Sequence, residues 1–339
     1  MPLGRAHASV IMLRKLYRSI PGRLVGLYLA LTVASLATIT FLVYRTTHYI
    51  LLASVEDQLR TVTAGKSDLI ARWMNERQHD VGVLAKSEAV EAHTQLLAEG
   101  AAGDLSSRRR AVGTLLRLVR VQYGAYHDIK LVGVDSQLLA SSRGGGSSTW
   151  EAAAPVGLAV RRGDPFVSEV YRISGSDGLS LVMASPVASE EGQLLGAVIA
   201  TVDLDGVNEL TDTTRLLTAG RAYHVDDRGV LIAHPDRKQL LRDDVARLDG
   251  PRAVVRGQSG VAQYLDGSGA EVIGAYEWLP RWRWGLVAEV GRDQALQPVR
   301  DARKDLLIIA ALVTIAVLLG TLLVVRSIVG PLRELNRPT

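Results

Sequence analysis

The sequence predicts an α+β protein: one long helix followed by two similar sets of antiparallel strands, with a membrane-spanning helix on each side. Three observations predict this class. Uncharged stretches lie near both ends of the chain, a long stretch without proline follows the first of them, and later runs of β-branched residues resemble one another at a fixed offset. A chain of 339 residues has room for one or two domains between the two apolar stretches.

The two uncharged stretches are residues 24–44, LVGLYLALTVASLATITFLVY, and residues 306–325, LLIIAALVTIAVLLGTLLVV. About twenty residues that rise about 1.5 Å each cross a hydrocarbon core of about 30 Å, and in lipid a helix satisfies such a backbone. We therefore predict two transmembrane helices. The alternatives are a cleaved signal peptide for the first stretch, whose apolar run is longer than such a peptide needs, and a buried core helix for the second, which lacks a polar face.

The N-terminal tail, residues 1–23, is basic and has no acidic residue. Its basic residues are Arg5, Arg14, Lys15, Arg18 and Arg23. The positive-inside rule then predicts a cytoplasmic N-terminus. Two spans place residues 326–339 on the same side of the membrane and residues 45–305 outside the cytoplasm.

Composition excludes several kinds of chemistry. The chain has no cysteine, which rules out disulfides, thiolate zinc sites and thiol nucleophiles. The net charge of +4 is explained by basic residues beside the membrane, so no nucleic-acid partner is expected. His224 and His234 fall on neighbouring predicted strands, where hydrogen bonds to the backbone are expected in preference to a shared metal. We expect no catalytic residue, cofactor or metal ion within this sequence, and whether a longer parent protein is an enzyme stays open.

Residues 46–98 contain no proline and only two glycines, so we predict one long helix there. Apolar residues recur in it at steps of three and four, with Lys66 in one of the intervening positions. The stripe consists of Leu52, Val55, Leu59, Val62, Leu69 and Trp73. Two interpretations remain open: the stripe packs on its own domain, or it pairs with a second copy of the chain in a homodimer.

A second amphipathic helix is predicted over residues 111–122. After it, short β-branched and apolar runs alternate with Gly, Ser, Asp and Pro, a pattern typical of strands and turns. The predicted strands are residues 129–135, 137–141, 166–171, 179–187, 192–204, 222–226, 230–233, 260–265, 271–277 and 284–289.

Two parts of this strand region resemble each other. IKLVGVDSQLLASS at 129–142 matches RAYHVDDRGVLIAHP at 221–235, and the strand pair within 181–204 matches the pair within 273–292 in the same order. The offset is about ninety residues throughout, and self-similarity at a fixed offset marks duplicated structural units. We therefore predict two similar α+β modules, at about residues 105–210 and 215–292.

The order of these elements resembles the double Cache sensor domain of bacterial transmembrane receptors. The resemblance covers about residues 46–305 and is carried by WMNERQHDVGVLAKSEAV, VDSQLLASS, VDDRGVLIAHP and GAYEWLPRWRWGLVAEV. It implies two PAS-like antiparallel sheets on one long N-terminal helix. It also implies that the receptor is anchored in the plasma (inner) membrane of a bacterium, with these sheets outside the cytoplasm. It also implies a small-molecule pocket in the module further from the membrane.

The C-terminal residues 326–339, RSIVGPLRELNRPT, resemble the start of a HAMP signalling helix. Leu332 and Leu335 have helical spacing, and a helix can begin again at Pro331, because the first turn lacks amide partners anyway. The alternative is a short basic tail. A HAMP unit is longer than this segment, so we expect the chain to stop before its output begins.

The resemblance directs the search for ligand-binding residues to the first module, where pockets combine aromatic walls with a few polar groups. The candidates are Tyr123, Tyr126, Trp150, Tyr171 and Asp203. Asp203 matches the position at which amino-acid-sensing members of the family bind the ligand's ammonium group, but their Arg-x-Trp-Tyr run is absent, since this loop reads SSTWEAAAP. Ordinary packing of the aromatic rings, and a turn at Asp203, are the alternatives.

These observations predict a receptor that binds a small ligand outside the cell and passes a conformational signal through its second membrane helix. The expected partners are the ligand, the lipid bilayer, a second copy of the chain and a cytoplasmic output. We expect the input half of a sensor histidine kinase. A chemotaxis receptor, a nucleotide cyclase and a membrane-anchored surface protein without a ligand are the alternatives.

Overall fold

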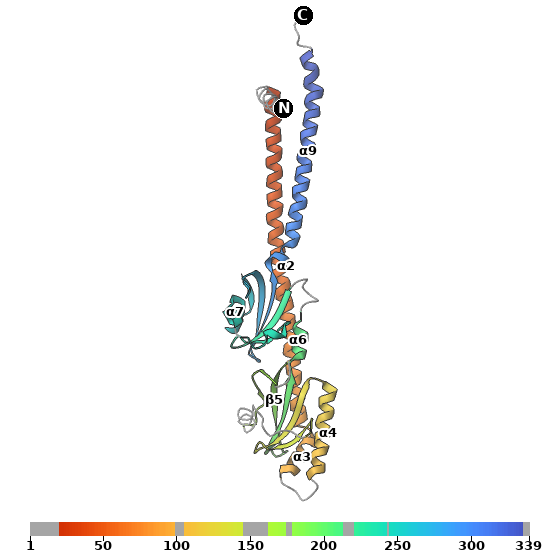
Figure 1. The fold of residues 1–339 in the computed structure, drawn as a ribbon, viewed down its shortest axis with the longest axis vertical. Helices are drawn as coiled ribbons and strands as arrows, with labels where there is room; N and C mark the ends of the chain where they lie inside the picture. Colours follow the sequence, from red (N-terminus) through yellow and green to blue (C-terminus); the bar gives the residue numbers. More distant parts are fainter. Residues whose placement is uncertain are drawn as a thin grey trace, which may run out of the picture. The chain divides into compact units, whose positions relative to one another are not determined.

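The computed structural model describes residues 20–98, 105–144, 162–173, 178–212, 220–242 and 244–334 (Figure 1). The chain divides into two compact units. One consists of Met1–Val55 with Asp293–Thr339, and the other is Glu56–Arg292. The α-helices that the structure describes in the second unit are the C-terminal part of α2 (Ile20–Ala85), α3 (Glu88–Ala98), α4 (Leu105–Tyr123), α6 (Asp205–Thr211) and α7 (Asp249–Val255).

The second unit contains two antiparallel sheets. Sheet A has the order β2-β1-β6-β5-β3, with β4 also paired to β5, and sheet B has the order β8-β7-β11-β10-β9. The strands of sheet A are β1 (Tyr126–Gly133), β2 (Leu138–Ser141), β3 (Phe166–Val167), β4 (Tyr171–Arg172), β5 (Leu179–Ala188) and β6 (Leu194–Asp203). Those of sheet B are β7 (Gly220–Asp226), β8 (Leu231–Ala233), β9 (Gly260–Leu265), β10 (Glu271–Leu279) and β11 (Trp284–Gly291). The shared strand order is what the sequence repeat predicts.

The predicted strands are present, and one of them is interrupted. In place of a single strand at 166–171, β3 and β4 pair separately with β5. Between them, the amide of Ser168 donates to the carbonyl oxygen of Val182 at 2.8 Å, and the amide of Val182 donates to the Ser168 hydroxyl, also at 2.8 Å. Because this hydroxyl takes the place of a backbone carbonyl, the regular ladder stops at Ser168.

The long helix differs from the prediction at its C-terminal end. Helix α2 ends at Ala85, and α3 begins at Glu88 after a short break. Ser87 sits just before α3, the position where serine is favoured as a cap, and its hydroxyl donates to the carbonyl oxygen of Leu84 at 2.8 Å. The next helix, α4, begins at Leu105, six residues before the predicted start at 111.

The buried face of α2 lies slightly off the predicted stripe. Leu59, Ile70 and Met74 are fully buried, whereas the predicted Leu69 is 45% exposed. An α-helix turns once per 3.6 residues, so a stripe read at a strict 3.5-residue repeat drifts around the helix. The stripe therefore packs on its own domain at Leu59 but not at Leu69.

Lys66 attaches α2 to the short helix α6. Its Nζ donates to the carbonyl oxygens of Leu210 at 2.5 Å and Asp212 at 3.1 Å, at the C-terminal end of α6. A cation is favoured there because the last carbonyls of a helix carry partial negative charge. Burial lowers the pKa of Lys66, and the nearby Asp212 opposes this shift. The polar interruption of the apolar stripe is thus a helix cap.

His224 on β7 lies beside this cap and is fully buried. Its Nδ1 and the Thr211 hydroxyl are 3.1 Å apart, while its Nε2 has no partner among the described residues. Burial lowers the pKa of His224 to about 3, and the charge of Lys66 adds to the effect. The imidazole is therefore neutral in the folded protein.

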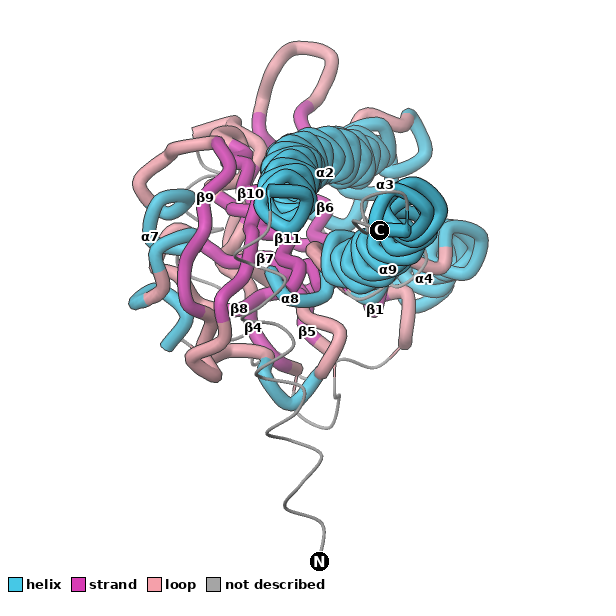
Figure 2. Tube along the Cα trace, turned by 90° about the horizontal axis from the view of Figure 1, so that it is seen from above, coloured by secondary structure: helices cyan, strands magenta, loops and turns pink. Residues whose placement is uncertain are grey.

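Helix α7 lies beside sheet B (Figures 1 and 2). The face of the sheet on that side, opposite to His224, carries a buried carboxylate, Glu289. Glu289 is 1% exposed and accepts hydrogen bonds from the hydroxyls of Tyr223 at 2.6 Å and Tyr264 at 2.7 Å, and from Arg221 Nε at 2.7 Å. Gly274 on β10 makes room for the Tyr264 ring, since a Cβ at this glycine would lie 2.3 Å from the Tyr264 hydroxyl oxygen. Burial and Glu289 raise the pKa of both tyrosines, so both hydroxyls stay protonated as donors.

The other unit pairs the N-terminal part of α2 with α9 (Gln297–Glu334). Among the described residues, the helical segment Gly26–Ala85 is long and apolar enough to cross a membrane, and its most apolar window has a mean hydropathy of 2.0 with none of it buried. Helix α9 contains the predicted second span and continues through Pro331 to Glu334, so no new helix begins at this proline.

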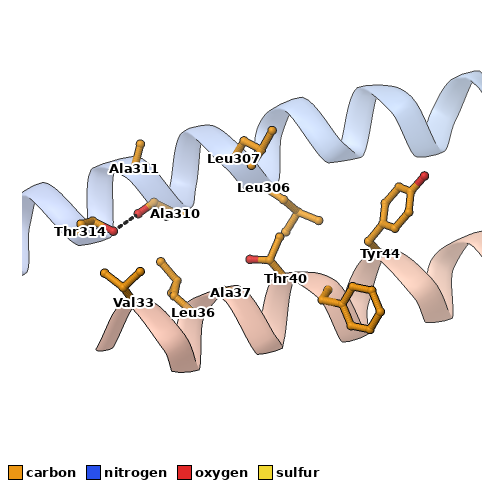
Figure 3. A pocket seen from close by; sticks show the side chains of 11 residues that line it. Val33, Leu36, Ala37, Thr40, Tyr44, Leu306, Leu307, Ala310, Ala311 and Thr314 are labelled. Carbon is orange, nitrogen blue, oxygen red and sulfur yellow. Dashed lines mark hydrogen bonds between the residues drawn. The ribbon is translucent and has the colours of Figure 1, made fainter. Parts of the chain in front are cut away.

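A groove of about 640 Å³ lies between the two helices of this unit (Figure 3). Small side chains line much of it, including Ala37 on α2 and Ala310 and Ala311 on α9. The Thr314 hydroxyl donates to the carbonyl oxygen of Ala310 at 2.8 Å, within its own helix. The facing surfaces of both helices are thus apolar.

We predict that the protein becomes less stable as the pH is lowered, because His224 is buried in its neutral form. The pKa of its folded-state imidazole, about 3, lies below the ordinary value of 6.5, so the unfolded state binds more protons between these values. Lowering the pH from 7 to 5 should cost about 2 kcal/mol of unfolding free energy through this residue. Denaturant titrations of the detergent-solubilised chain at both pH values measure the cost. His224→Gln should shrink it, and the same change at exposed His79 should not; an equal pH effect in wild type and His224→Gln would contradict the prediction.

We also predict that Gly274→Ala destabilises the protein by about 1–3 kcal/mol, because the new methyl group displaces the Tyr264 hydroxyl from buried Glu289. The matched control is Gly267→Ala, since a Cβ at Gly267 meets no atom within 4 Å. Thermal unfolding of both variants measures the difference. Equal melting temperatures for the two variants would show that Tyr264 moves at no cost.

Candidate functional site

The candidate site is the face of sheet A that points away from α2, which we call the outer face. The opposite face contacts α2, since Gly82 lies beside the Ser185 hydroxyl and the Tyr126 hydroxyl donates to Asp80 Oδ2 at 3.2 Å. Side chains alternate between the two faces along each strand. The outer face therefore carries Asp128 and Lys130 of β1, Ser180, Val182 and Ala184 of β5, Ala197, Ile199, Thr201 and Asp203 of β6, Phe166 of β3 and Tyr171 of β4.

Two of the predicted residues lie in one row on this face. Tyr171 is directly opposite Ser180 on β5, and Ser180 is directly opposite Asp203 on β6. Directly opposed residues of an antiparallel pair have Cβ atoms about 5 Å apart. Tyr171 and Asp203 therefore belong to one row across three strands.

One half of the outer face is apolar. Val182, Ala184, Ala197 and Ile199 form a buried cluster. Half-buried aromatic and aliphatic side chains pack against this cluster: Phe166, Tyr171, Val132 and Leu194. The four residues of the cluster are 0–2% exposed, so the apolar groups that a small molecule could contact here are the half-buried side chains around them.

The other half carries charge. Asp128 is 8% exposed and accepts from the Ser142 hydroxyl at 2.6 Å and the Ser141 hydroxyl at 3.2 Å. Lys130 Nζ lies 3.8 Å from Asp128 Oδ2. Since Thr201 is opposite Asp128 on β6, an acceptor, a cation and a hydroxyl lie together beside the apolar half.

A bulge in β1 places a histidine and an arginine at the same end of the sheet. The register between β1 and β6 shifts between Tyr126 and Asp128, so His127 has no partner opposite it. Arg143 donates to His127 Nε2. Burial lowers the pKa of His127, and the charge of Arg143 lowers it further, against the opposing effect of the carboxylates of Asp128 and Asp203. His127 is thus a neutral acceptor for Arg143.

Asp203 has a second, local role. Its Oδ1 accepts from the amide of Asp205 at 3.0 Å, at the start of α6, and its own amide donates to the carbonyl oxygen of Ala125 at 2.9 Å. The turn role that the sequence left open therefore exists. It also fixes the carboxylate at the end of β6, beside Ser180 and Tyr171.

The other candidates do not join this row. Tyr126 is 5% exposed on the face toward α2, and Tyr123 is 47% exposed at the end of α4. Their rings lie edge to face, with centroids 6.3 Å apart. The Arg77 guanidinium lies 5.7 Å from the centre of the Tyr123 ring and 6.0 Å from the centre of the Tyr126 ring. Burial and Asp80 raise the pKa of Tyr126. Both tyrosines anchor β1 and α4 to α2, and Trp150 lies outside the described residues.

Three charged residues of this candidate site are not among the residues predicted from the sequence: Asp128, Lys130 and Arg143. Polar Asp128 and Lys130 alternate with Ile129 and Leu131, which are 1% and 0% exposed. This alternation was a usable signal, but the predicted strand began at Ile129 and left Asp128 out. No local pattern marks Arg143, which reaches the site through the turn after β2.

The described residues do not group into a metal site. Among them, no three His, Cys, Asp or Glu side chains come together in a way that could hold an ion. His224 points to the α2 side of sheet B, whereas the His234 ring lies 6.0 Å from Tyr223, which belongs to the α7 side. His234 Nδ1 accepts from the amide of Asp236 at 3.0 Å. The two histidines therefore do not converge.

Several bacterial receptors are similar in sequence to this chain. The methyl-accepting chemotaxis protein McpA of Pseudomonas putida is 29% identical over 189 residues, which are 53% of this chain and 28% of McpA. PctB of Pseudomonas aeruginosa, another methyl-accepting chemotaxis protein, is 23% identical over 188 residues, again 53% of this chain and 28% of the relative. The chain thus spans little more than a quarter of the length of these relatives.

Solved structures share the fold. The ligand-binding domain of the Pseudomonas aeruginosa amino acid chemoreceptor PctC, in complex with GABA, superposes with a TM-score of 0.51 at 20% identity, over 70% of this chain and 99% of that domain. The extracellular domain of rpHK1S-Z16, described as a histidine kinase, gives a TM-score of 0.55 at 14% identity, over 73% of this chain and 98% of that domain. The family model for the Cache domain, of the dCache_1 type, matches residues 49–299, which is well over half of the chain. The chain belongs to the Cache domain family.

Proposed function

We propose that the chain is the sensing part of a bacterial transmembrane receptor, and that it binds a small polar molecule on the outer face of sheet A. The observation that carries the proposal is that Tyr171, Asp203, Asp128 and Lys130 share one face of sheet A with an apolar cluster. Carboxylates and a cation on a partly buried wall recognise polar ligands by charge-assisted hydrogen bonds.

The ligand that fits this surface carries both an ammonium and a carboxylate group. Asp203 and Asp128 supply acceptors for an ammonium group, while Lys130 and Arg143 supply donors for a carboxylate. The missing Arg-x-Trp-Tyr run argued against amino acid sensing, since it left no cation for the carboxylate. Lys130 on β1 and Arg143 in the turn after β2 can fill that role, and GABA, which the PctC domain binds, is a compound of this kind.

We propose that α2 and α9 both span the membrane, with both chain ends in the cytoplasm, and that the receptor works as a homodimer. The support for the two spans is the basic N-terminal tail together with the uncharged stretches in the sequence of both helices. Ligand binding biases two arrangements of these helices by its differential affinity for them, and helix shifts of about 1–2 Å can transmit such a bias. Residues 326–339 then begin the HAMP segment that leads to the output.

Two outputs remain candidates. A chemotaxis receptor is favoured, because the curated relatives are methyl-accepting chemotaxis proteins. A sensor histidine kinase is the second candidate, on the sequence expectation set out above. A nucleotide cyclase and a ligand-free surface anchor have no comparable support.

We predict that an amino acid or amino carboxylate raises the melting temperature of the full chain in detergent micelles, because binding to the folded state stabilises it. Asp203→Asn should weaken binding of that compound at least tenfold, as expected for the loss of a charge-assisted hydrogen bond. Tyr126→Phe, on the other face of the same sheet, is the matched control. Thermal shift with a panel that includes GABA and the common amino acids, followed by calorimetry, measures both effects. An intact fold that no compound stabilises would refute direct sensing.

We predict that fixing α2 to α9 abolishes signalling. The chain has no cysteine, so the pair Ala37→Cys and Ala310→Cys, which line one groove, can be oxidised selectively. In the full-length receptor, the crosslink should lock the output at one level regardless of ligand. Each single cysteine is the control, and an output that still responds to ligand after complete crosslinking would exclude motion between these helices as the signal.

A further inference from the structure

A second cavity lies between the two sheets, away from the outer face of sheet A. Its volume is about 270 Å³. Helix α2, the β3–β4 connection of sheet A, and the β7–β8 and β10–β11 turns of sheet B surround it, all within the unit Glu56–Arg292. A molecule in this cavity touches both sheets and the helix that carries them.

The acidic side chains that line the cavity already have basic partners. Asp226 Oδ2 accepts from Arg228 Nη2 at 2.9 Å, and the same guanidinium lies 3.1 Å from Glu169 Oε2. Asp227 is paired with Arg283. The three carboxylates of the cavity therefore share two guanidinium groups, and this set keeps a net negative charge.

Two donors on the β10–β11 turn are not satisfied in this way. Trp282 Nε1 is buried and has no acceptor among the described residues. Arg281 donates to the side-chain oxygen of Gln78 at 2.6 Å, and its guanidinium lies 5.2 Å from the centre of the Trp282 ring. Within the described part of the chain, no carboxylate forms an ion pair with Arg281.

These two groups define what the cavity can recognise. The indole N–H is a donor only, and a buried donor without an acceptor is costly, so folded proteins rarely keep one. A guanidinium matches the geometry of a carboxylate. The Arg281 guanidinium lies 5.2 Å from the centre of the Trp282 ring and both residues line the cavity, so one carboxylate there can be bound by both side chains.

We propose that this cavity is a second ligand site, which takes a small monocarboxylate held by Arg281 and Trp282. A volume of about 270 Å³ accommodates roughly ten non-hydrogen atoms, taking the volume of one water molecule in the liquid as the unit. The neighbouring carboxylates of Glu169, Asp226 and Asp227 disfavour a second negative charge on the ligand. The occupant joins the β3–β4 connection of sheet A to the β10–β11 turn of sheet B, so it stabilises one arrangement of the two sheets.

The test is calorimetric titration of the full chain, in micelles, with sodium propionate at constant ionic strength, with sodium chloride as the reference. We expect saturable binding of propionate. Trp282→Phe removes the N–H and keeps the ring, and Arg281→Gln removes the charge; each should weaken binding at least tenfold. Arg292→Gln is the matched control, because Arg292 pairs with Glu271 outside the cavity. Asp203→Asn tests the outer face, and both control variants should bind as wild type does.

The proposal is overturned if propionate shows no saturable binding, or if both Trp282→Phe and Arg281→Gln bind it as wild type does. It is also overturned if Asp203→Asn alone abolishes binding, since the carboxylate then occupies the outer face. A readout in the unaltered protein covers the case in which a variant fails to fold. With ¹⁵N-labelled tryptophan, propionate should shift one indole N–H signal downfield, and unchanged indole signals would reject the site.

Discussion

The single buried face of α2 is the constraint on which both sheets depend. Between Glu56 and Ala85 this helix passes from sheet B to sheet A and makes separate contacts with each. Lys66 caps α6 beside sheet B, Gln78 contacts the β10–β11 turn, and Asp80 accepts from Tyr126 of sheet A. Residues of a helix are fixed at about 1.5 Å of rise each, so these contacts set the spacing of the two sheets. Neither sheet can slide along α2 without breaking one of them.

Much of the fold followed from the sequence because the signals for it are local or repeated. Strands appear as short β-branched runs, and the repeat at one offset shows that two sets of them share an order. The predicted helices and strands differ from the structure where a single side chain determines the local backbone. The long helix is interrupted at Ser87, whose hydroxyl donates to Leu84. The Ser168 hydroxyl divides a predicted strand in two. Because the helical repeat drifts from the predicted stripe, Ile70 is buried in place of Leu69. None of these three features can be predicted from the average propensity or hydropathy of the surrounding residues.

The candidate site was less predictable than the fold. Its residues come together only if their side chains lie on the same face of the sheet, and this depends on strand register. Tyr171 and Asp203 lie on one face because the register between β4, β5 and β6 places them in one row. Tyr126 precedes a bulge and faces α2 instead, although it is only two residues from Asp128. A one-residue bulge reverses the direction of every side chain beyond it, and no sequence pattern here marks its position.

The buried Glu289 cluster gives the duplication a further meaning. In sheet B, the face that corresponds to the outer face of sheet A is occupied by the protein's own side chains, with the hydroxyls of Tyr223 and Tyr264 bound to Glu289. Sheet B therefore resembles a module with a permanent internal substitute for a ligand. After a duplication, one module can keep a face that binds a ligand, while the other is held in a single conformation and moves as a rigid body. On this view, a substitution at Gly274 or Tyr264 changes how firmly sheet B is held in one conformation, whereas a substitution at Asp203 changes the outer face of sheet A alone.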